Sequence, residues 1–391
     1  MVAPESIRVA LDAHVVGRRG TGNETYVVNL ADALTAHPDV QPIVLLDRGT
    51  PWPSQPCPEA RSLRMQTRLA RIPFELPVAA RRVRADLLHV QYVAPPIARV
   101  PVVAAIHDLS FEDMPWLFPR SSELRLKVSV RTTARRASAV IAISEFTRSR
   151  LIDRYDLDPA RVFMTPVALS THWQPTSDET IRETTGLLGI EGPFVLAVGN
   201  THPRKNLARL VRAVAALRAR GLLDLRVVVV GQPRRHAVEV NAAIDRVAGW
   251  DWVTFTGFVD RDTLRALYGA ARVVAYVSLY EGLGLPVLEA LACGAVVVAS
   301  GTTAVPEAAG SAAVLVDPSS DESVIDGLSR ALTDESLRRE LSHAGTRHAA
   351  TFTMDRFAHA TVDAYRAAIG TDPRTNGPRR RRRWPTLVRH G

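Results

Sequence analysis

The most informative stretch of the sequence is residues 278–294, which read SLYEGLGLPVLEALACG. An apolar run ends where the stretch begins, and a glycine-bearing loop then leads into a helical pattern with Pro286 in its first turn. Glu281 stands at the mouth of the loop, and Glu289 lies about one turn into the helix. The glycines between them allow backbone N–H groups to face an anion at the helix N-terminus. The pattern predicts a strand, loop and helix that bind an anionic ligand, and a solvated loop with a capping glutamate is the alternative.

Outward from this stretch, apolar runs alternate with helical patterns along most of the chain. The runs are continuous rather than alternating, which is typical of parallel sheets covered on both faces. Strands are expected at 7–14, 42–47, 85–91, 102–108 and 139–144, and then at 194–200, 225–231, 252–257, 271–278, 295–300 and 312–317. The sequence therefore predicts an α/β protein made of two doubly wound, Rossmann-like domains. Ligands of such sheets bind at the carboxyl ends of the strands, so we expect the domains to face each other across a cleft.

A stretch rich in Pro, Thr and Ser at 165–180 separates the two series of strands. We expect an N-terminal domain at 1–168 and a C-terminal domain at 169–352. An amphipathic helix at 353–370 is expected to cross back to the first domain. Residues 371–391 contain Pro, Gly and five consecutive arginines, and this composition predicts a disordered basic tail.

Composition excludes several classes of protein. The chain has 391 residues, 46% hydrophobic and 23% charged, as in ordinary globular proteins. Two cysteines, Cys57 and Cys293, exclude a disulfide framework and a cysteine-rich metal site. The net charge is +9, but the last twenty residues supply +6 with seven arginines and one aspartate, so the basicity does not indicate nucleic acid binding. No apolar run could span a membrane and no secretory leader is recognised, so we expect a cytoplasmic protein.

A second motif, GNTHPRKNL at 199–207, lies between a predicted strand and a predicted helix. Lys205 is one of only two lysines in the chain, and Arg204 adjoins it. A lysine ammonium is a compact charge that suits a phosphate group. The motif predicts a phosphate-binding turn, and a solvated basic turn is the alternative.

These two motifs together resemble the family-4 glycosyltransferases, a retaining, nucleotide-sugar-dependent group with the GT-B fold, and the resemblance covers almost all of residues 5–370. In that family the first glutamate of E-x7-E, here Glu281, contacts donor-sugar hydroxyls, and the second, here Glu289, contacts the ribose. The resemblance implies that loop amides contact the sugar and phosphate, here those of Gly282, Leu283, Gly284 and Leu285. The family pattern is usually EGFGLP, and Leu283 replaces its phenylalanine. A backbone contact there should tolerate the change.

The resemblance implies that the domain at 1–168 lies on the acceptor side and that the domain at 169–352 binds the nucleotide sugar. It extends to six individual residues. Arg204 and Lys205 match the stretch that holds the donor diphosphate, while Asn200 stands where some members carry an arginine. Gly20 and Gly22 fit a glycine-bearing loop that closes over the phosphate and acceptor, although a flexible turn explains them as well. His107 matches a histidine at the reaction centre, although a histidine at a strand end is often structural.

We therefore expect a retaining, metal-independent hexosyltransferase without a cofactor. The local patterns are similar to those of bacterial mannosyltransferases of polysaccharide assembly. GDP-mannose is thus the expected donor, with a UDP-sugar as the alternative, and a glycan or lipid-linked molecule is the expected acceptor. The alternatives are a sugar-nucleotide epimerase of the same fold and a catalytically silent partner-binding subunit.

Two predictions concern metals and membranes. Two D-x-D tripeptides, at 156–158 and 260–262, stand at helix boundaries where capping explains them, so no metal site is expected. The arginine-rich tail could hold the protein peripherally on an anionic membrane surface, at its inner face. No nucleic acid partner is expected.

Overall fold

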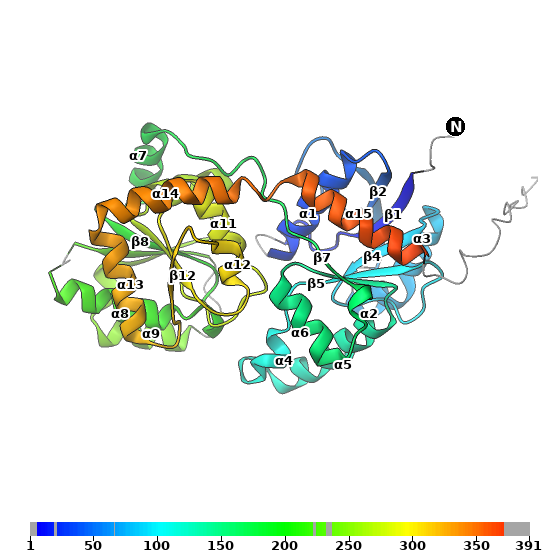
Figure 1. Ribbon diagram of the computed structural model, residues 1–391, viewed down its shortest axis with the longest axis horizontal. Coiled ribbons are helices and arrows are strands. Elements are labelled where there is room, and N and C mark those ends of the chain that lie inside the picture. Colours follow the sequence, from blue (N-terminus) through cyan, green and yellow to red (C-terminus); the bar gives the residue numbers. More distant parts are fainter. Residues whose placement is uncertain (1–5, 19–21, 66, 222–223, 232–236, 371–391) are drawn as a thin grey trace, which may run out of the picture.

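The computed structural model describes residues 6–18, 22–65, 67–221, 224–231 and 237–370. Figure 1 shows two α/β domains side by side, joined by the chain at two places. The predicted glycine at position 20 and the basic tail lie outside the described residues.

In the N-terminal domain, parallel strands form a sheet in the order β3-β2-β1-β4-β5-β6-β7. The strands are β1 (Ile7–Asp12), β2 (Val40–Asp47), β3 (Glu59–Leu63), β4 (Leu87–Gln91), β5 (Val102–Ile106), β6 (Ala139–Ala142) and β7 (Val162–Met164). The helices are α1 (Gly22–Thr35), α2 (Arg68–Ala70), α3 (Leu76–Arg82), α4 (Ser110–Asp113), α5 (Arg120–Arg136) and α6 (Glu145–Tyr155), with a π-helical segment at Arg71–Glu75 between α2 and α3.

The C-terminal domain repeats this architecture with a parallel sheet in the order β10-β9-β8-β11-β12-β13. Its strands are β8 (Phe194–Val198), β9 (Arg226–Val230), β10 (Val253–Gly257), β11 (Val273–Tyr276), β12 (Val297–Ser300) and β13 (Val314–Val316). Its helices are α7 (Asp178–Leu187), α8 (Leu207–Ala219), α9 (Val238–Arg246), α10 (Arg261–Ala270), α11 (Leu285–Ala292), α12 (Val305–Ala309), α13 (Asp321–Thr333) and α14 (Glu335–Ala349). The prediction of two doubly wound parallel domains is confirmed.

Buried side chains fill both faces of each sheet, because successive residues of a strand point to opposite faces. In β5, for example, Val103 and Ala105 join one core while Ala104 and Ile106 join another. This two-sided burial accounts for the continuous apolar runs in the sequence.

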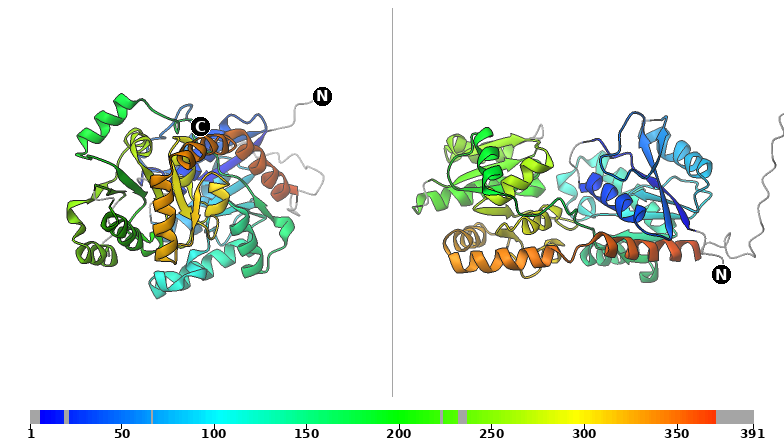
Figure 2. Two further views of the ribbon diagram at one scale, coloured as in Figure 1. Left: turned by 60° about the vertical axis from the view of Figure 1, so that its left-hand side comes forward. Right: turned by 90° about the horizontal axis from the view of Figure 1, so that it is seen from above.

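The last described helix, α15 (Met354–Gly370), packs against α1 and against strands of the N-terminal sheet. Figure 2 shows α14 and α15 following one another along the same side of the two domains. Where the chain crosses between domains, the N–H of Leu169 donates to the carbonyl oxygen of Phe352 at 2.9 Å. The two crossings thus lie side by side.

Helix caps explain both D-x-D tripeptides, as the sequence predicted. Asp158 accepts a hydrogen bond from the N–H of Ala160, and Asp260 accepts one from the N–H of Thr263. Ser144 likewise caps α6 through the N–H of Thr147.

Candidate active site

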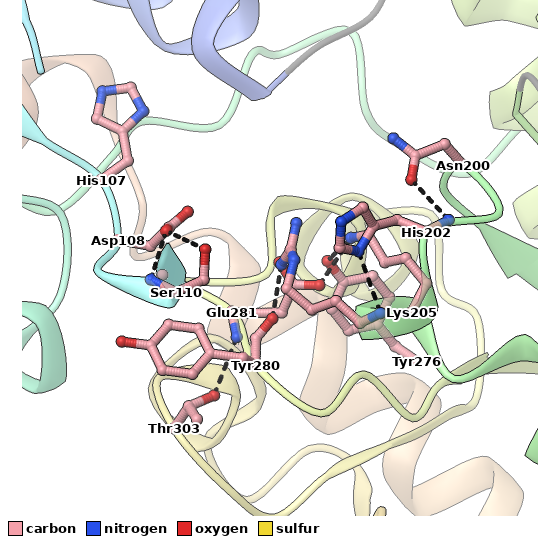
Figure 3. A network of polar contacts seen from close by, with 12 residues as sticks. His107, Asp108, Ser110, Asn200, His202, Lys205, Tyr276, Tyr280, Glu281 and Thr303 are labelled. Atoms are coloured by element: carbon pink, nitrogen blue, oxygen red, sulfur yellow. Dashed lines mark hydrogen bonds and ion pairs between the residues drawn. The ribbon is translucent and has the colours of Figure 1, made fainter. Parts of the chain in front are cut away.

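Glu281 is the centre of a buried ion cluster in the loop between β11 and α11, residues 277–284, which we call the donor loop. Its Oε1 lies 2.7 Å from Nζ of Lys205 (Figure 3). Its Oε2 lies 2.6 Å from Nη1 of Arg204. Burial opposes ionisation of Glu281, but the charges of Lys205 and Arg204 outweigh it and lower the pKa to about 2. Burial also lowers the pKa of Lys205, and Glu281 offsets part of that effect. The Glu281 carboxylate is therefore ionised between two basic side chains.

The turn from β8 into α8 holds Lys205 in this position. Asn206 adopts a left-handed conformation, with φ of 57°, and its side-chain amide donates to the carbonyl oxygens of Val277 and Pro318. A Cβ atom at Gly199 would lie 3.1 Å from Cε of Lys205, so the glycine leaves room for the lysine stem. Nζ also donates to the hydroxyl of Tyr276 at 2.9 Å.

Hydrogen bonds to two neighbouring segments fix the donor loop. The N–H of Leu279 donates to the carbonyl oxygen of Arg204 at 2.8 Å, and the N–H of Glu281 donates to Oγ1 of Thr303 at 3.2 Å. Gly284 then starts α11 with φ of 111°, a backbone conformation that favours glycine. The loop therefore presents the Glu281 carboxylate in one defined position.

Glu289 lies about one turn into α11 and is buried at 8% exposure. Its Oε2 accepts a hydrogen bond from the hydroxyl of Tyr268 at 3.0 Å. Burial raises the pKa of Glu289 to about 7, although the Tyr268 hydrogen bond and the charge of Arg261 oppose the rise. Near neutral pH this carboxyl group therefore exists in both protonation states.

This pKa predicts a pH-dependent effect of Glu289→Gln on stability. The unfolded chain releases the proton near pH 4.5, whereas the folded protein keeps it up to about pH 7. The folded state thus binds more protons in this interval, so this group lowers the free energy of unfolding as the pH rises through it. Glutamine cannot ionise, so the variant should gain stability relative to the wild type between pH 5 and pH 8. Thermal melts at both pH values measure this, and a difference that stays constant would contradict the raised pKa.

His107 follows β5 in the N-terminal domain and lies across from the Glu281 cluster (Figure 3). Its Nδ1 is 2.9 Å from Oδ1 of Asn23, and burial lowers the pKa of His107 to about 4. The ring is therefore neutral at pH 7. With Nδ1 donating to Asn23, Nε2 is an acceptor, and it has no protein partner among the described residues. Nε2 is itself buried in this conformation.

Asp108 caps the segment that follows His107. Its Oδ1 accepts from the N–H and hydroxyl of Ser110, at 2.9 and 2.7 Å (Figure 3). Asn200 caps the turn that follows it in the same way, because its Oδ1 accepts a hydrogen bond from the N–H of His202 at 3.1 Å.

The structure brings the predicted residues of the two domains together at Gly282. A Cβ atom there would lie 2.0 Å from the carbonyl oxygen of His107, so the donor loop and the His107 segment are in direct backbone contact. Leu283 is buried, Leu285 begins α11, and Gly22 begins α1. Within the described ranges, no group of three or more His, Cys, Asp or Glu side chains is arranged to hold a metal ion.

Sequence reasoning missed three residues that hold the site. Tyr276 binds Lys205, Thr303 binds the backbone of Glu281, and Asn23 binds His107. Tyr276 and Thr303 belong to segments with no motif of their own. Asn23 lies within the glycine-bearing stretch that the sequence singled out, but its partner is 84 residues away.

Comparison with known proteins identifies the family to which this chain belongs. The model of the family described as Glycosyltransferase Family 4 matches residues 20–173, and that of Glycosyl transferases group 1 matches residues 183–348. The D-inositol 3-phosphate glycosyltransferase of Rhodococcus opacus is 30% identical over 74% of this chain and 67% of its own length. The chain therefore belongs to glycosyltransferase family 4, of the group 1 type.

Two mannosyltransferases and one solved structure complete the comparison. O-antigen chain mannosyltransferase B of Escherichia coli is 28% identical over 68% of this chain and 70% of its own length. The serotype-specific mannosyltransferase WbdA of Escherichia coli is 29% identical, but the match spans only 30% of that longer protein. The HepE protein of Anabaena, solved with UDP-glucose, has a TM-score of 0.74 at 19% identity and covers 92% of this chain and 100% of its own. The fold is thus GT-B.

Proposed function

We propose that this glycosyltransferase moves a hexose from a nucleoside diphosphate sugar to an acceptor hydroxyl with retention of configuration. One observation carries the proposal: the Glu281 carboxylate is held between Lys205 and Arg204, and the next residue, Gly282, meets the His107 segment of the other domain. This arrangement offers acceptors for sugar hydroxyls beside cations for a diphosphate. A silent subunit would not need both sets of groups, and an epimerase would need acid and base carboxylates in the cleft as well.

In the proposed reaction, the bond between the anomeric carbon and the diphosphate oxygen breaks while the acceptor oxygen attacks from the same face. The acceptor proton passes to the departing phosphate oxygen, so no strong protein base is required. Lys205 and Arg204 stabilise the negative charge that develops on the leaving diphosphate. Glu281 and Nε2 of His107 hold the sugar so that its anomeric carbon faces the acceptor.

The proposed transfer is independent of metal ions. The two cations beside Glu281 and the N-terminus of α11 already supply positive potential where the diphosphate would lie. Neither D-x-D tripeptide is available for a metal–diphosphate complex, because Asp158 and Asp260 cap helices.

GDP-mannose is the proposed donor, supported by the names of the mannosyltransferase relatives. A UDP-sugar is the alternative, since HepE was solved with UDP-glucose. Calorimetric titration of the protein with GDP and UDP separates the two, because a selective base site should favour one nucleotide by at least about tenfold. We expect tighter binding of GDP. Tighter binding of UDP would overturn the mannose assignment.

We also propose that the N-terminal domain lies against an anionic membrane, where a lipid-linked acceptor would be found. No helix in the described part of the chain is long and apolar enough to cross a bilayer. Large apolar side chains are nevertheless exposed on α2, the π-helical segment and α5, namely Leu69, Phe74, Leu124 and Val128. The same two helices carry basic side chains, Arg68 on α2 and Arg125 on α5. Apolar and basic side chains together suit an anionic bilayer surface.

Replacing Leu69 and Phe74 by glutamate should therefore weaken binding to vesicles that contain phosphatidylglycerol. Leu187→Glu is the matched control, since Leu187 is equally exposed but belongs to the C-terminal domain. Cosedimentation at low salt measures the binding. Equal binding of the double variant and the control would contradict this surface, and binding that is lost only on removal of residues 371–391 would assign it to the tail.

A further inference from the structure

The two domains meet in a buried polar junction directly behind the donor loop. The carbonyl oxygen of Gly282 accepts a hydrogen bond from Oγ of Ser144 at 2.7 Å. Oγ1 of Thr147 lies 3.2 Å from the carbonyl oxygen of His107 and 3.4 Å from that of Gly282. Ser144 and Thr147 are both 1% exposed. Two hydroxyl groups of the N-terminal domain thus tie the backbone beside Glu281 to the backbone of His107.

Tyr280, the residue before Glu281, makes a second contact across the junction. Its hydroxyl donates to Oδ2 of Asp113 at 3.0 Å, and its ring meets the ring of Phe146 edge-on at 5.6 Å. Arg150 binds both carboxylate oxygens of Asp113 from within the N-terminal domain. The N-terminal domain therefore holds the donor loop on both sides of Glu281.

Glu307 on α12 makes the third contact. Its two carboxylate oxygens accept hydrogen bonds from the N–H groups of Glu145 and Phe146, at 2.7 and 2.8 Å. These N–H groups begin α6, where helix amides lack partners within their own helix and favour a negative charge. A carboxylate of the C-terminal domain thus caps the N-terminus of α6 in the N-terminal domain.

We propose that Tyr280 and Glu307 are positioning residues that couple domain closure to assembly of the active site. The Tyr280 hydroxyl joins the donor loop to Asp113, on the segment that follows His107, and the Glu307 carboxylate joins α12 to the start of α6. Formation of these contacts fixes the distance between Glu281 and His107. In the proposed reaction these two residues hold one sugar between them. The inference rests on the proposed transfer reaction, because only that reaction needs both groups at once.

The test compares Tyr280→Phe, Glu307→Ala and their double variant with Tyr155→Phe as control. Tyr280→Phe removes one oxygen and keeps the ring against Phe146. Tyr155 also donates to a carboxylate, that of Glu112 at 3.1 Å, but both residues lie in the N-terminal domain. Removal of its hydroxyl therefore costs a similar hydrogen bond without touching the junction.

For the double variant we expect kcat to fall by roughly tenfold to a hundredfold, because misplacement of reacting groups by about 1 Å has effects of this size. Affinity for the nucleoside diphosphate should change little. The groups proposed to bind the diphosphate, namely Lys205, Arg204 and the N-terminus of α11, all lie in the C-terminal domain. The radius of gyration from small-angle scattering should increase. Tyr155→Phe should leave kcat and the radius of gyration unchanged.

Unchanged kcat in the double variant, or an equal loss in Tyr155→Phe, would overturn the positioning role. If the double variant does not fold, kcat of Tyr280→Phe alone is compared with the wild type, and an unchanged kcat would again overturn the positioning role. Small-angle scattering tests this inference independently of the proposed function, because it measures domain separation and not transferase activity. A wild type without transferase activity would refute the function, whereas an unchanged radius of gyration in the folded variant would refute the junction as the contact that holds the domains together.

Discussion

Lys205→Ala should lower kcat by about a hundredfold or more, because it removes a preorganised charge at the leaving diphosphate. Glu281→Ala should have an effect of the same order, since it removes the group proposed to hold the sugar. It also leaves Lys205 and Arg204 as two buried cations without their shared counter-ion. Both variants are measured with saturating donor, so that weaker binding does not mask the effect on turnover.

Lys127→Ala is the matched control, because it removes the other lysine of the chain. Its Nζ lies 2.7 Å from Glu123 on the same helix and 3.8 Å from Glu112 on α4, and both pairs are within the N-terminal domain. Such a pair contributes little, and turnover should stay near the wild-type value. Near-normal turnover of Lys205→Ala or Glu281→Ala would show that the assignment of that residue is wrong.

Gly282→Ala should also abolish most of the transfer activity, by at least about a hundredfold. The added Cβ would lie 2.0 Å from the carbonyl oxygen of His107 and 2.8 Å from its carbon, and neither backbone atom can move aside as a flexible side chain could. The loop and the His107 segment must therefore separate, which moves Glu281 away from His107. Nucleotide binding to the C-terminal domain should persist.

The control for this substitution is Gly186→Ala in α7. A Cβ atom there meets nothing within 4 Å, and alanine favours the helix over glycine. Activity and stability of this variant should match or exceed those of the wild type. Full activity of Gly282→Ala would show that the domain contact at this glycine is not needed for transfer.

The sequence predicted the fold well where strands are buried on both faces. The strand at 226–230 reads RVVVV, and such continuous runs identify a covered parallel sheet. It did not predict β3, because EARSL is polar and three of its five residues are exposed at the sheet edge. It also missed β7, which has only three residues, and the start of α7 inside the stretch interpreted as a break.

The same contrast holds for the site. Glu281, Lys205 and Arg204 were found from local motifs, and the structure places them in contact. The contact of Glu307 with α6 could not be found in this way, because it joins residues 161 and 162 positions apart that form no common motif. Local spacing identifies groups that one turn or loop brings together, whereas contacts between domains depend on how the folded domains pack.

The central claim is that this site transfers a hexose with retention, and one measurement tests it most directly. The wild-type protein is incubated with GDP-mannose and an α-mannoside acceptor in excess EDTA, and proton and phosphorus NMR spectra follow the products. We predict GDP as the released nucleotide and a new α-linked mannoside. A β-linked product, an epimerised sugar nucleotide, or activity that appears only after a divalent metal is added would contradict the account.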